Sequence, residues 1–537
     1  MKSKKYIQVI FGFVSVFLMV SSAIGIPQSS QTTMQPLEKE DFDPLEDIWV
    51  TVEIQQIRSF ERRNRFPSSI QNTDLLSKPD LYVKVFINDV EFKSPVWHNT
   101  RYVYQQPWIA ELDVPDDEEW VNITIQVWDW NIGFDTLCDI SREYYGNARD
   151  MKELTLEYSV KTGHWAGDDF IEHDPVSFDP SGYGRASGID DGSLFEDEDD
   201  CEVWFDVYQN DTDGDMIPYF AETEYYGTDP TVDDTGFDPD NDGVPIEWEH
   251  RYGHAFGWNW HTQEYVHYWI YDPFEWEDHA NLDPDDDGLT NVEEYMMWGW
   301  GSDPFRQDLF IEMDYMETSP AGVSCRLSER SKELLRTSFN RQNIVLHLDD
   351  GLLIDCVAPY VAAAPVSDCD MIPFSEYTGR NNGFQQLYQQ YFIHFDEENW
   401  KQGVFHYGPV VNSSDYQGFA WYSGVGDVIC FQISAGMLED LKVWPHAAWR
   451  RDVVQASVYM HELGHTLGIF HDNTPGCDDQ QGRYPWEVNW WRWGSYMSTM
   501  NYRYTYMIVD YSDGSRGSND FNDWETIDLT YFSRPKY

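Results

Sequence analysis

Residues 461–471 read HELGHTLGIFH, and this stretch decides how the C-terminal part of the chain folds. The residues before it, 452–460, include Val and Ala side chains without Gly or Pro, which predicts a helix running into the stretch. Residues four apart lie on one face of a helix. The imidazoles of His461 and His465 are therefore expected to bind the same metal ion.

A third ligand is predicted beyond the end of this helix. Gly468 can take a left-handed conformation that stops the helix, so that the chain turns and His471 returns toward the metal. Three neutral imidazoles at about 2.0–2.1 Å suit Zn²⁺ and leave a fourth position for water. Glu462, beside the first ligand, is placed to take a proton from that water as a general base and to pass it to a leaving amine.

A second segment supports this interpretation. Residues 498–502 read STMNY, which supplies a methionine able to pass under the metal and a tyrosine two residues later. Together the long histidine motif and this segment resemble the metzincin clan of zinc endopeptidases. The resemblance implies zinc ligands His461, His465 and His471, the general base Glu462, the turn glycine Gly468, the Met-turn residue Met500, and a catalytic Tyr502 that ligates zinc or stabilises the oxyanion.

The resemblance covers residues 306–537 and implies an α+β catalytic domain with a twisted, mixed sheet and an active-site helix beneath it. Residues 427–433 predict a strand, which in this clan is an edge strand that holds peptide substrates antiparallel. Asp472, directly after the third histidine, resembles an acidic residue with a structural or orienting role in some of these families. The chain departs from the pattern in that no inhibitory propeptide is evident between its start and its first β-rich region.

Acidic repeats precede this domain, at residues 206–305. Residues 238–243 read DPDNDG and are followed by Glu249, so oxygen ligands fall at positions 1, 3, 5 and 12 with glycine at 6, as in EF-hand calcium loops. A later loop repeats the spacing, and an earlier one does so with Met216 in place of the glycine. Their form resembles thrombospondin type 3 repeats, which fold around calcium with little regular structure. The predicted calcium ligands are Asp211, Asp213, Asp215 and Glu222; Asp238, Asp240, Asp242 and Glu249; and Asp283, Asp285, Asp287 and Glu294.

The N-terminal region, residues 47–160, is rich in short alternating apolar and polar runs that predict an antiparallel β-sandwich. Aspartates cluster in its loops and resemble the two calcium loops of C2 domains, which implies that Asp74, Asp80, Asp129 and Asp135 bind calcium. Docking to a membrane, a cell envelope or another partner is the role that this resemblance implies.

The remaining segments are assigned from composition. Residues 1–25 combine lysines, an apolar run and small residues, which predicts a secretory signal peptide, the alternative being an uncleaved anchor. Residues 26–46 and the Gly-rich, acidic residues 161–205 are predicted linkers. Seven cysteines permit disulfides outside the cell but their spacing assigns none.

The net charge of the chain limits the kinds of molecule that it can bind. The chain of 537 residues has 95 acidic and 35 basic side chains, a net charge of −60, which excludes nucleic acid and disfavours anionic membranes unless cations intervene. The sequence thus predicts a secreted, multidomain zinc metalloendopeptidase that is stabilised by calcium and acts on proteins or peptides. The alternative is a calcium-dependent surface or adhesion protein with a degenerate protease domain. A salt-rich habitat is a second explanation of the charge, compatible with specific calcium sites.

Overall fold

The structure is a computed structural model that describes residues 47–59, 78–103, 107–131, 133–140, 152–168, 182–188, 201–259, 261–350, 371–396, 399–422, 428–439 and 451–531. The predicted signal peptide and N-terminal linker lie outside these residues. The described residues form two compact units: those within 47–235 and 250–272 belong to the first, and those within 236–249 and 273–531 belong to the second. Within the described ranges, no helix combines the length and apolarity that a membrane crossing would need.

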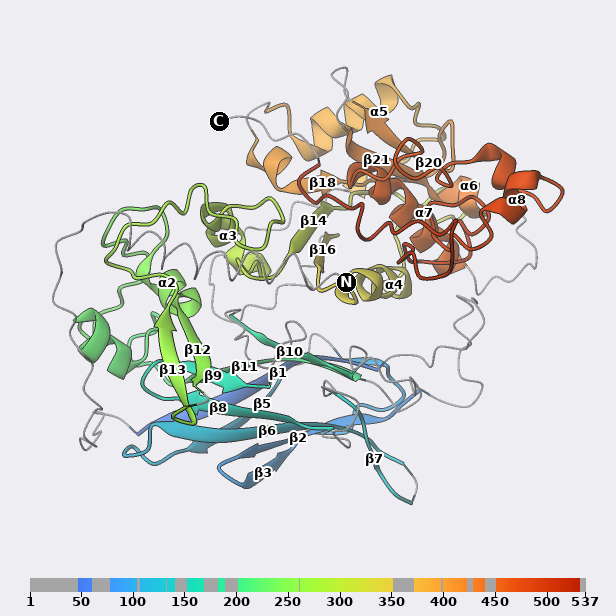
Figure 1. Cartoon of the computed structure of the whole chain (residues 1–537). Coiled ribbons are helices and arrows are strands. Elements are labelled where there is room, and N and C mark those ends of the chain that lie inside the picture. Colours follow the sequence, from blue (N-terminus) through green and yellow to red (C-terminus); the bar gives the residue numbers. More distant parts are fainter. Residues whose placement is uncertain are drawn as a thin grey trace. The chain divides into compact units, whose positions relative to one another are not determined.

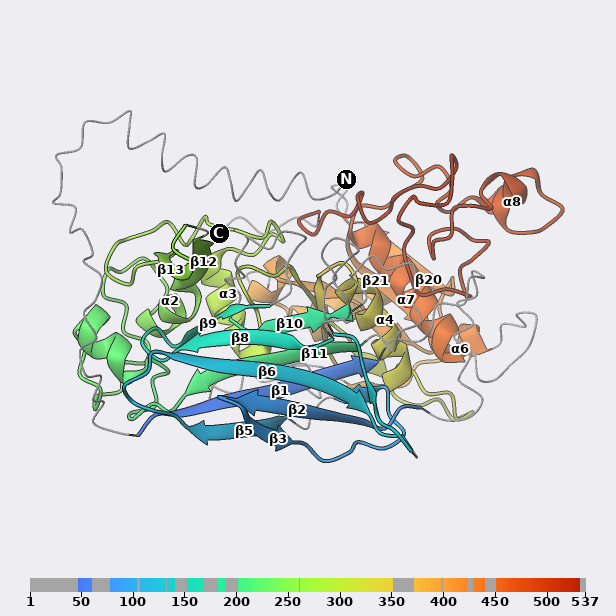
Figure 2. The same ribbon diagram turned by 60° about the horizontal axis from the view of Figure 1, so that its bottom comes forward.

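The first unit contains two antiparallel sheets, whose long strands run side by side in Figure 2. One sheet has the order β10-β11-β1-β4, with β5 also paired to β1; the other has the order β3-β2-β6-β8-β9, with β7 paired to β6. The strands are β1 (Trp49–Ser59), β2 (Leu81–Ile87), β3 (Val90–Lys93), β4 (Tyr102–Val103), β5 (Trp108–Asp113), β6 (Trp120–Asp129), β7 (Thr136–Leu137), β8 (Leu154–Ser159), β9 (His164–Gly167), β10 (Gly184–Ser187) and β11 (Cys201–Gln209).

Alternating side chains explain why these strands pack as a sandwich. In β6, Val121, Ile123, Ile125 and Val127 are buried and the residues between them are more exposed, because successive side chains point to opposite faces of a strand. They join the inward side chains of both sheets in one apolar core. The predicted antiparallel sandwich is confirmed.

The predicted linker over residues 161–205 is wrong, because β9, β10 and the start of β11 lie in it. β11 pairs with β1 along its whole length, so the sandwich extends to Gln209. Gly184 is required by packing, since a Cβ there would lie 2.0 Å from the Phe205 ring. Arg185 and Glu202 are charged yet buried, as a pair 3.3 Å apart. The prediction failed because glycine and charged residues are typical of solvent-exposed loops, whereas here they belong to buried strands. The acidic tract 196–200 lies outside the described residues.

The predicted repeat region, residues 206–305, is divided between the two units and has more regular structure than expected. It contains the hairpin of β12 (His254–Asn259) and β13 (Glu264–Trp269), a π-helical turn (Ala221–Tyr226), a short 3₁₀ turn (Trp298–Trp300), and the helices α2 (Ile246–Gly253) and α3 (Asn291–Met297).

The second unit is built on an eight-stranded mixed sheet with the order β16-β14-β18-β21-β19-β15-β17, in which β20 pairs with β21. Among the described residues, the strands of this sheet pair in parallel, except that β20 is antiparallel to β21. The strands are β14 (Asp308–Glu312), β15 (Tyr315–Met316), β16 (Val345–Asp349), β17 (Met371–Ile372), β18 (Phe405–Tyr407), β19 (Val410–Val411), β20 (Gly418–Tyr422) and β21 (Val428–Ser434). The expected mixed sheet is therefore present.

Helices accompany this sheet: α4 (Glu329–Asn340), α5 (Asn382–Leu387), α6 (Ala435–Glu439), α7 (Arg451–Thr466) and α8 (Val488–Arg492). α7 lies against β20 and β21, as Figure 1 shows. The strand predicted at residues 427–433 exists as β21, but it is internal to the sheet and not its edge. Within the described residues the antiparallel strand β20 pairs only with β21, so it occupies the edge position expected of β21.

Candidate functional site

The helix α7 carries the predicted metal-binding residues and ends where the sequence predicts. It is buried from Val454 to Thr466, because it packs between the sheet and the loops that follow it. Gly468 has φ +87°, a left-handed conformation that suits glycine. The N–H of Ile469 donates to the carbonyl of Gly464 (2.9 Å), which closes the end of the helix.

All three predicted histidine ligands have their Nδ1 atoms next to backbone carbonyl oxygens. The distances are 2.9 Å from His461 to Thr499, 2.8 Å from His465 to Ile469, and 2.9 Å from His471 to Cys477. In the neutral tautomer with its proton on Nδ1, each imidazole donates a hydrogen bond to its carbonyl and has its lone pair on Nε2, where a metal ion can bind. Histidines that ligate metals are characteristically oriented in this way.

An unpredicted residue, Asp478, meets two of these histidines. Its Oδ1 lies 3.1 Å from Nε2 of His461, and its Oδ2 lies 3.3 Å from Nε2 of His465. Burial works to raise the pKa of Asp478, but the hydrogen bonds and charges of the two histidines hold it far below its usual range. Burial likewise works to lower the pKa of His461, and Asp478 outweighs it, so that this pKa rises to about 9. Both Nε2 atoms thus face the same carboxylate.

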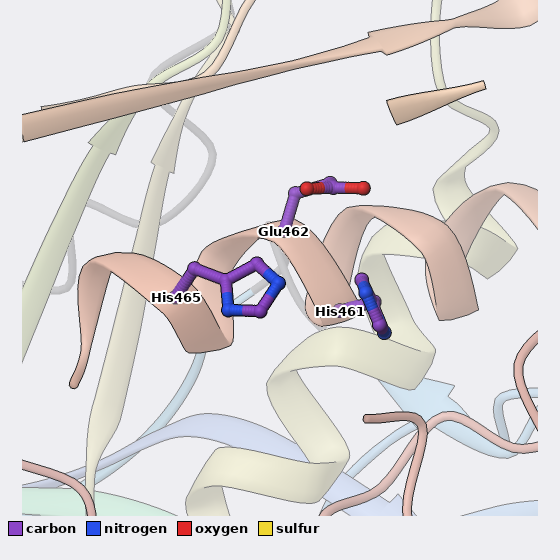
Figure 3. A group of neighbouring side chains, drawn as sticks. All are labelled: His461, Glu462 and His465. Carbon is purple, nitrogen blue, oxygen red and sulfur yellow. The ribbon is translucent and has the colours of Figure 1, made fainter. Parts of the chain in front are cut away.

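Glu462 completes this group, since donor atoms of His461, Glu462 and His465 lie within 4.8 Å of one another. Figure 3 shows the three side chains projecting from neighbouring turns of α7. Burial raises the pKa of Glu462, and the two histidines oppose that rise. Gly418, the first residue of β20, lies directly beside this carboxylate: a Cβ at Gly418 would lie 2.5 Å from Oε1 of Glu462. The edge strand therefore passes close to the predicted base.

The predicted Met500 and Tyr502 both lie at this site. Met500 is fully buried, and its Sδ would lie 2.7 Å from a Cβ placed on Gly464, so it packs against α7 between the two histidines. The ring of Tyr502 stacks on His461 with centroids 5.7 Å apart and planes at 19°. Burial, followed by the charge of Asp478, raises the pKa of Tyr502 above its ordinary value.

Two predicted residues, His471 and Asp472, are exposed on the loop that follows α7, whereas His461, Glu462 and His465 are buried in the helix. The carboxylate that contacts the histidines is that of Asp478 and not that of Asp472. No spacing rule indicates Asp478, because it reaches the site through the fold of the loop, where its N–H donates to the carbonyl of Met500 (3.2 Å).

The three predicted calcium loops share one backbone arrangement. In each, the N–H of the sixth residue donates to the carboxylate of the first, and the sixth residue has a positive φ. The pairs are Met216 with Asp211 (2.7 Å, φ +73°), Gly243 with Asp238 (3.2 Å, φ +110°) and Gly288 with Asp283 (3.0 Å, φ +97°). The first loop therefore folds like the others although methionine replaces its glycine.

Carboxylates of the first loop converge in two overlapping groups. Donor atoms of Asp211, Asp213 and Asp215 lie within 4.8 Å of one another, and so do those of Asp215, Glu222 and the unpredicted Asp234. Burial, followed by the charge of Asp215, raises the pKa of Glu222 to about 8. A bound cation would remove this mutual repulsion.

The third loop is more deeply buried. Burial and neighbouring carboxylates raise the pKa of Asp285, Asp287 and Glu294 well above the ordinary range. Oε1 of Glu294, a fully buried residue, has no hydrogen-bond partner in the described part of the chain. The N–H of Asp308, the first residue of β14, donates to Asp287 (2.7 Å), so the loop is attached to the central sheet.

Three of the four aspartates predicted for the C2-like domain lie together, and Asp74 lies outside the described residues. The N–H of Asp80 donates to Asp129 (2.8 Å), and the hydroxyl of Tyr82 donates to Asp135 (2.8 Å). Asp80 itself accepts from the N–H of Asn99 (2.6 Å). Each of these three carboxylates thus accepts a hydrogen bond from a donor group of the protein itself.

A histidine cluster that the sequence analysis did not identify lies in the first unit. His164, His250, His254 and His267 pack with neighbouring ring centroids 4.5–5.0 Å apart. Tyr226 bridges His250 and His254 through its hydroxyl (2.9 Å to each), and His254 reaches His267 (2.7 Å). Burial lowers the pKa of His164 and of His267 to about 4, so the cluster is neutral at pH 7.

The cysteines that the structure describes, Cys138, Cys201, Cys325, Cys430 and Cys477, are all buried. The remaining two, Cys356 and Cys369, lie outside the described residues. Burial raises the pKa of Cys325 to about 11, which keeps it a protonated thiol at neutral pH.

Comparison with known proteins gives a limited result. No protein-family model and no curated protein matches the chain. Among solved structures, one described as a C2 domain is 15% identical (TM-score 0.16; 30% of this chain, 98% of that one). A C2 domain of plant extended synaptotagmin 1 is 13% identical (TM-score 0.17; 31% and 98%). Human GIVD cytosolic phospholipase A2 is 13% identical (TM-score 0.17; 31% and 18%). Likenesses of this size carry no information about ligand or activity.

Proposed function

We propose that this chain is a secreted zinc metalloendopeptidase whose acidic loops bind calcium. The observation that supports this most directly is the arrangement on α7. The Nε2 atoms of His461 and His465 face the same carboxylate, and donor atoms of His461, Glu462 and His465 lie within 4.8 Å of one another.

The donor set fits zinc, because imidazole nitrogens are common zinc ligands and the Nε2 atoms of His461 and His465 face the same carboxylate, at 3.1 and 3.3 Å from its oxygens. Zinc would be held by His461 and His465, with His471 as the predicted third nitrogen. The negative charge of Asp478 beside the two Nε2 atoms would favour the cation, and the fourth position would be left to water. When bound, zinc supplies Lewis acidity toward a peptide carbonyl and lowers the pKa of water.

The chain's own residues would position the substrate and move the proton. Glu462 accepts a proton at its carboxylate, and burial raises its pKa toward the range in which it can also return that proton to a leaving amine. A peptide can add as a further strand to the edge of β20, which is unpaired within the described residues, and its backbone would then pass Gly418 and reach Glu462. Tyr502 is the proposed hydrogen-bond donor to the oxyanion.

The test is Glu462→Gln in the full mature chain, with the exposed Glu525→Gln as a matched control. A peptide library and the zinc content of each variant are measured together. Glu462→Gln should lose at least about 10²-fold in kcat/KM and retain zinc, whereas the control keeps both. Undiminished peptidase activity in Glu462→Gln would refute the assignment of this residue as the base.

The alternative function is a calcium-dependent surface or adhesion protein with an inactive protease domain. A wild-type chain that holds zinc and cleaves nothing in a broad peptide library would favour it. The presence of all four predicted motif residues, His461, Glu462, His465 and His471, argues for the enzyme, because an inactive descendant usually lacks a ligand or the base. Docking to a membrane or envelope through the C2-like sandwich remains a prediction of the sequence.

A further inference from the structure

The second acidic loop meets two residues that its calcium pattern does not include. Donor atoms of Asp242, Glu249, Glu277 and His279 lie within 4.8 Å of one another. Asp242 and Glu249 are the fifth and twelfth positions of the loop, whereas Glu277 and His279 come from a later segment of the same unit.

His279 is fixed against the carboxylates from several sides. The side chains of His279, Asp242 and Glu249 have no exposed area, and Nε2 of His279 lies 3.2 Å from Asp242 and 3.7 Å from Glu249. Trp248 packs edge-on against the imidazole, with centroids 5.6 Å apart. The N–H of Glu277 donates to Asp242 (3.2 Å), which holds the later segment on the loop.

A single imidazole cannot balance the charge gathered here. Even when protonated it offers one positive charge against the three carboxylates of Asp242, Glu249 and Glu277. Within the described residues, Oε2 of Glu277 and both oxygens of Asp240 are buried without a hydrogen-bond partner. These oxygens and the charge excess indicate a cation.

The contact at Nδ1 of His279 allows its other nitrogen, Nε2, to be free of a proton and so to bind a metal ion. The buried side-chain amide of Asn291 lies 2.7 Å from Nδ1 of His279. An amide can present either its NH₂ group or its oxygen to the ring. With the NH₂ group facing Nδ1, the proton of His279 is on Nε2 and points to Asp242. With the oxygen facing Nδ1, the proton moves to Nδ1 and the Nε2 lone pair faces the carboxylates.

Nitrogen is the feature that separates this site from a calcium loop. Calcium is coordinated by oxygen ligands, whereas imidazole suits zinc and other first-row transition metals. We propose that Asp242, Glu249, Glu277 and His279 form a second metal site for a borderline divalent ion such as Zn²⁺ or Mn²⁺. In this loop alone, that ion takes the place of the calcium predicted from the spacing, and the calcium proposed for the first and third loops is unaffected. The site lies outside the proposed catalytic centre and does not depend on peptidase activity.

The test removes the first zinc site and then examines the second. In the full mature chain carrying His461→Ala and His465→Ala, zinc and manganese binding are measured by equilibrium dialysis against ZnCl₂ or MnCl₂ in the presence of excess CaCl₂. His279→Gln is compared with His261→Gln, a control at the exposed turn between β12 and β13. His279→Gln should weaken binding of about one transition-metal ion at least tenfold, with calcium content unchanged and no effect in the control.

Two outcomes would overturn the proposal. One is equal zinc and manganese binding in His279→Gln and the control. The other is displacement of the ion by calcium alone, which would make this loop an ordinary calcium loop. Should His279→Gln fail to fold, Glu277→Gln, a change at a half-buried position, is expected to give the same loss of zinc and manganese.

Discussion

Substituting Gly418 by alanine tests whether the edge strand β20 and the predicted base are as close as the structure has them. The added Cβ would lie 2.5 Å from Oε1, 2.7 Å from Cγ and 2.9 Å from Cδ of Glu462. Ordinary contact begins at 3.4 Å, so the closest of these approaches is 0.9 Å too short. Because three atoms of a buried side chain are involved, rotation of the carboxylate alone does not relieve the clash.

The expected effect on activity follows from this displacement. A catalytic group moved by about 1 Å costs on the order of 10²-fold in rate, which corresponds to about 2.7 kcal/mol. Overfilling a packed site costs about 1–3 kcal/mol of folding stability. Gly418→Ala should therefore lower kcat/KM about 10²-fold and lower the free energy of unfolding by about 1–3 kcal/mol, while zinc stays bound.

The assay combines peptide hydrolysis, urea unfolding and zinc analysis. Gly379→Ala is the matched control, because a Cβ there meets its nearest atom at 3.5 Å, an ordinary contact. Wild-type activity and stability in Gly418→Ala would refute the close approach of β20 to Glu462. Loss of zinc in parallel with activity would show that the substitution acts on the metal ligands instead.

Three further predictions concern other parts of the chain. Asp478→Asn should weaken zinc binding at least about tenfold, as measured by competition with a chelating dye; unchanged affinity would make Asp478 only a counter-ion of the histidines. Glu294→Gln should abolish most of the rise in Tm that calcium produces at high salt, and a rise equal to that of the wild type would argue against a specific ion in the third loop. His164 and His267 have folded pKa values of about 4, below the ordinary 6.5. Since the unfolded chain takes up these protons first, each costs about 2 kcal/mol of stability as the pH falls from 7 to 5. His267→Gln should therefore reduce the loss measured by urea unfolding at the two pH values by about 2 kcal/mol, and an unchanged loss would contradict a buried neutral His267.

Much of the secondary structure and of the candidate site was predicted from short sequence patterns. The spacing of His461, Glu462 and His465 on a helix, the left-handed Gly468 and the Asp-rich loops all depend on contacts within a few residues, which the sequence specifies directly. The alternation of β6 likewise predicted an antiparallel sandwich, because the side-chain period of a strand is two.

Errors arose where composition was taken as a sign of exposure. β10 and the start of β11 were expected to be part of a linker, since glycine and charged residues such as Gly184, Arg185 and Glu202 are typical of solvent-exposed segments. A glycine can instead make room for an aromatic ring, and two opposite charges can be buried together. Neither contact can be predicted from a single residue, because each depends on a partner elsewhere in the sequence.

The sequence by itself determined the chemistry available to this protein: imidazoles and a carboxylate at helical spacing, and oxygen ligands at loop spacing. Only the tertiary structure decided which distant groups join them. Asp478 approaches two histidines, Gly418 brings the edge strand to Glu462, and His279 enters an acidic loop, each across a separation in sequence that no local period encodes. The physical reason is that helix and turn geometry are set by neighbouring residues, whereas the meeting of remote side chains is set by how the whole core packs.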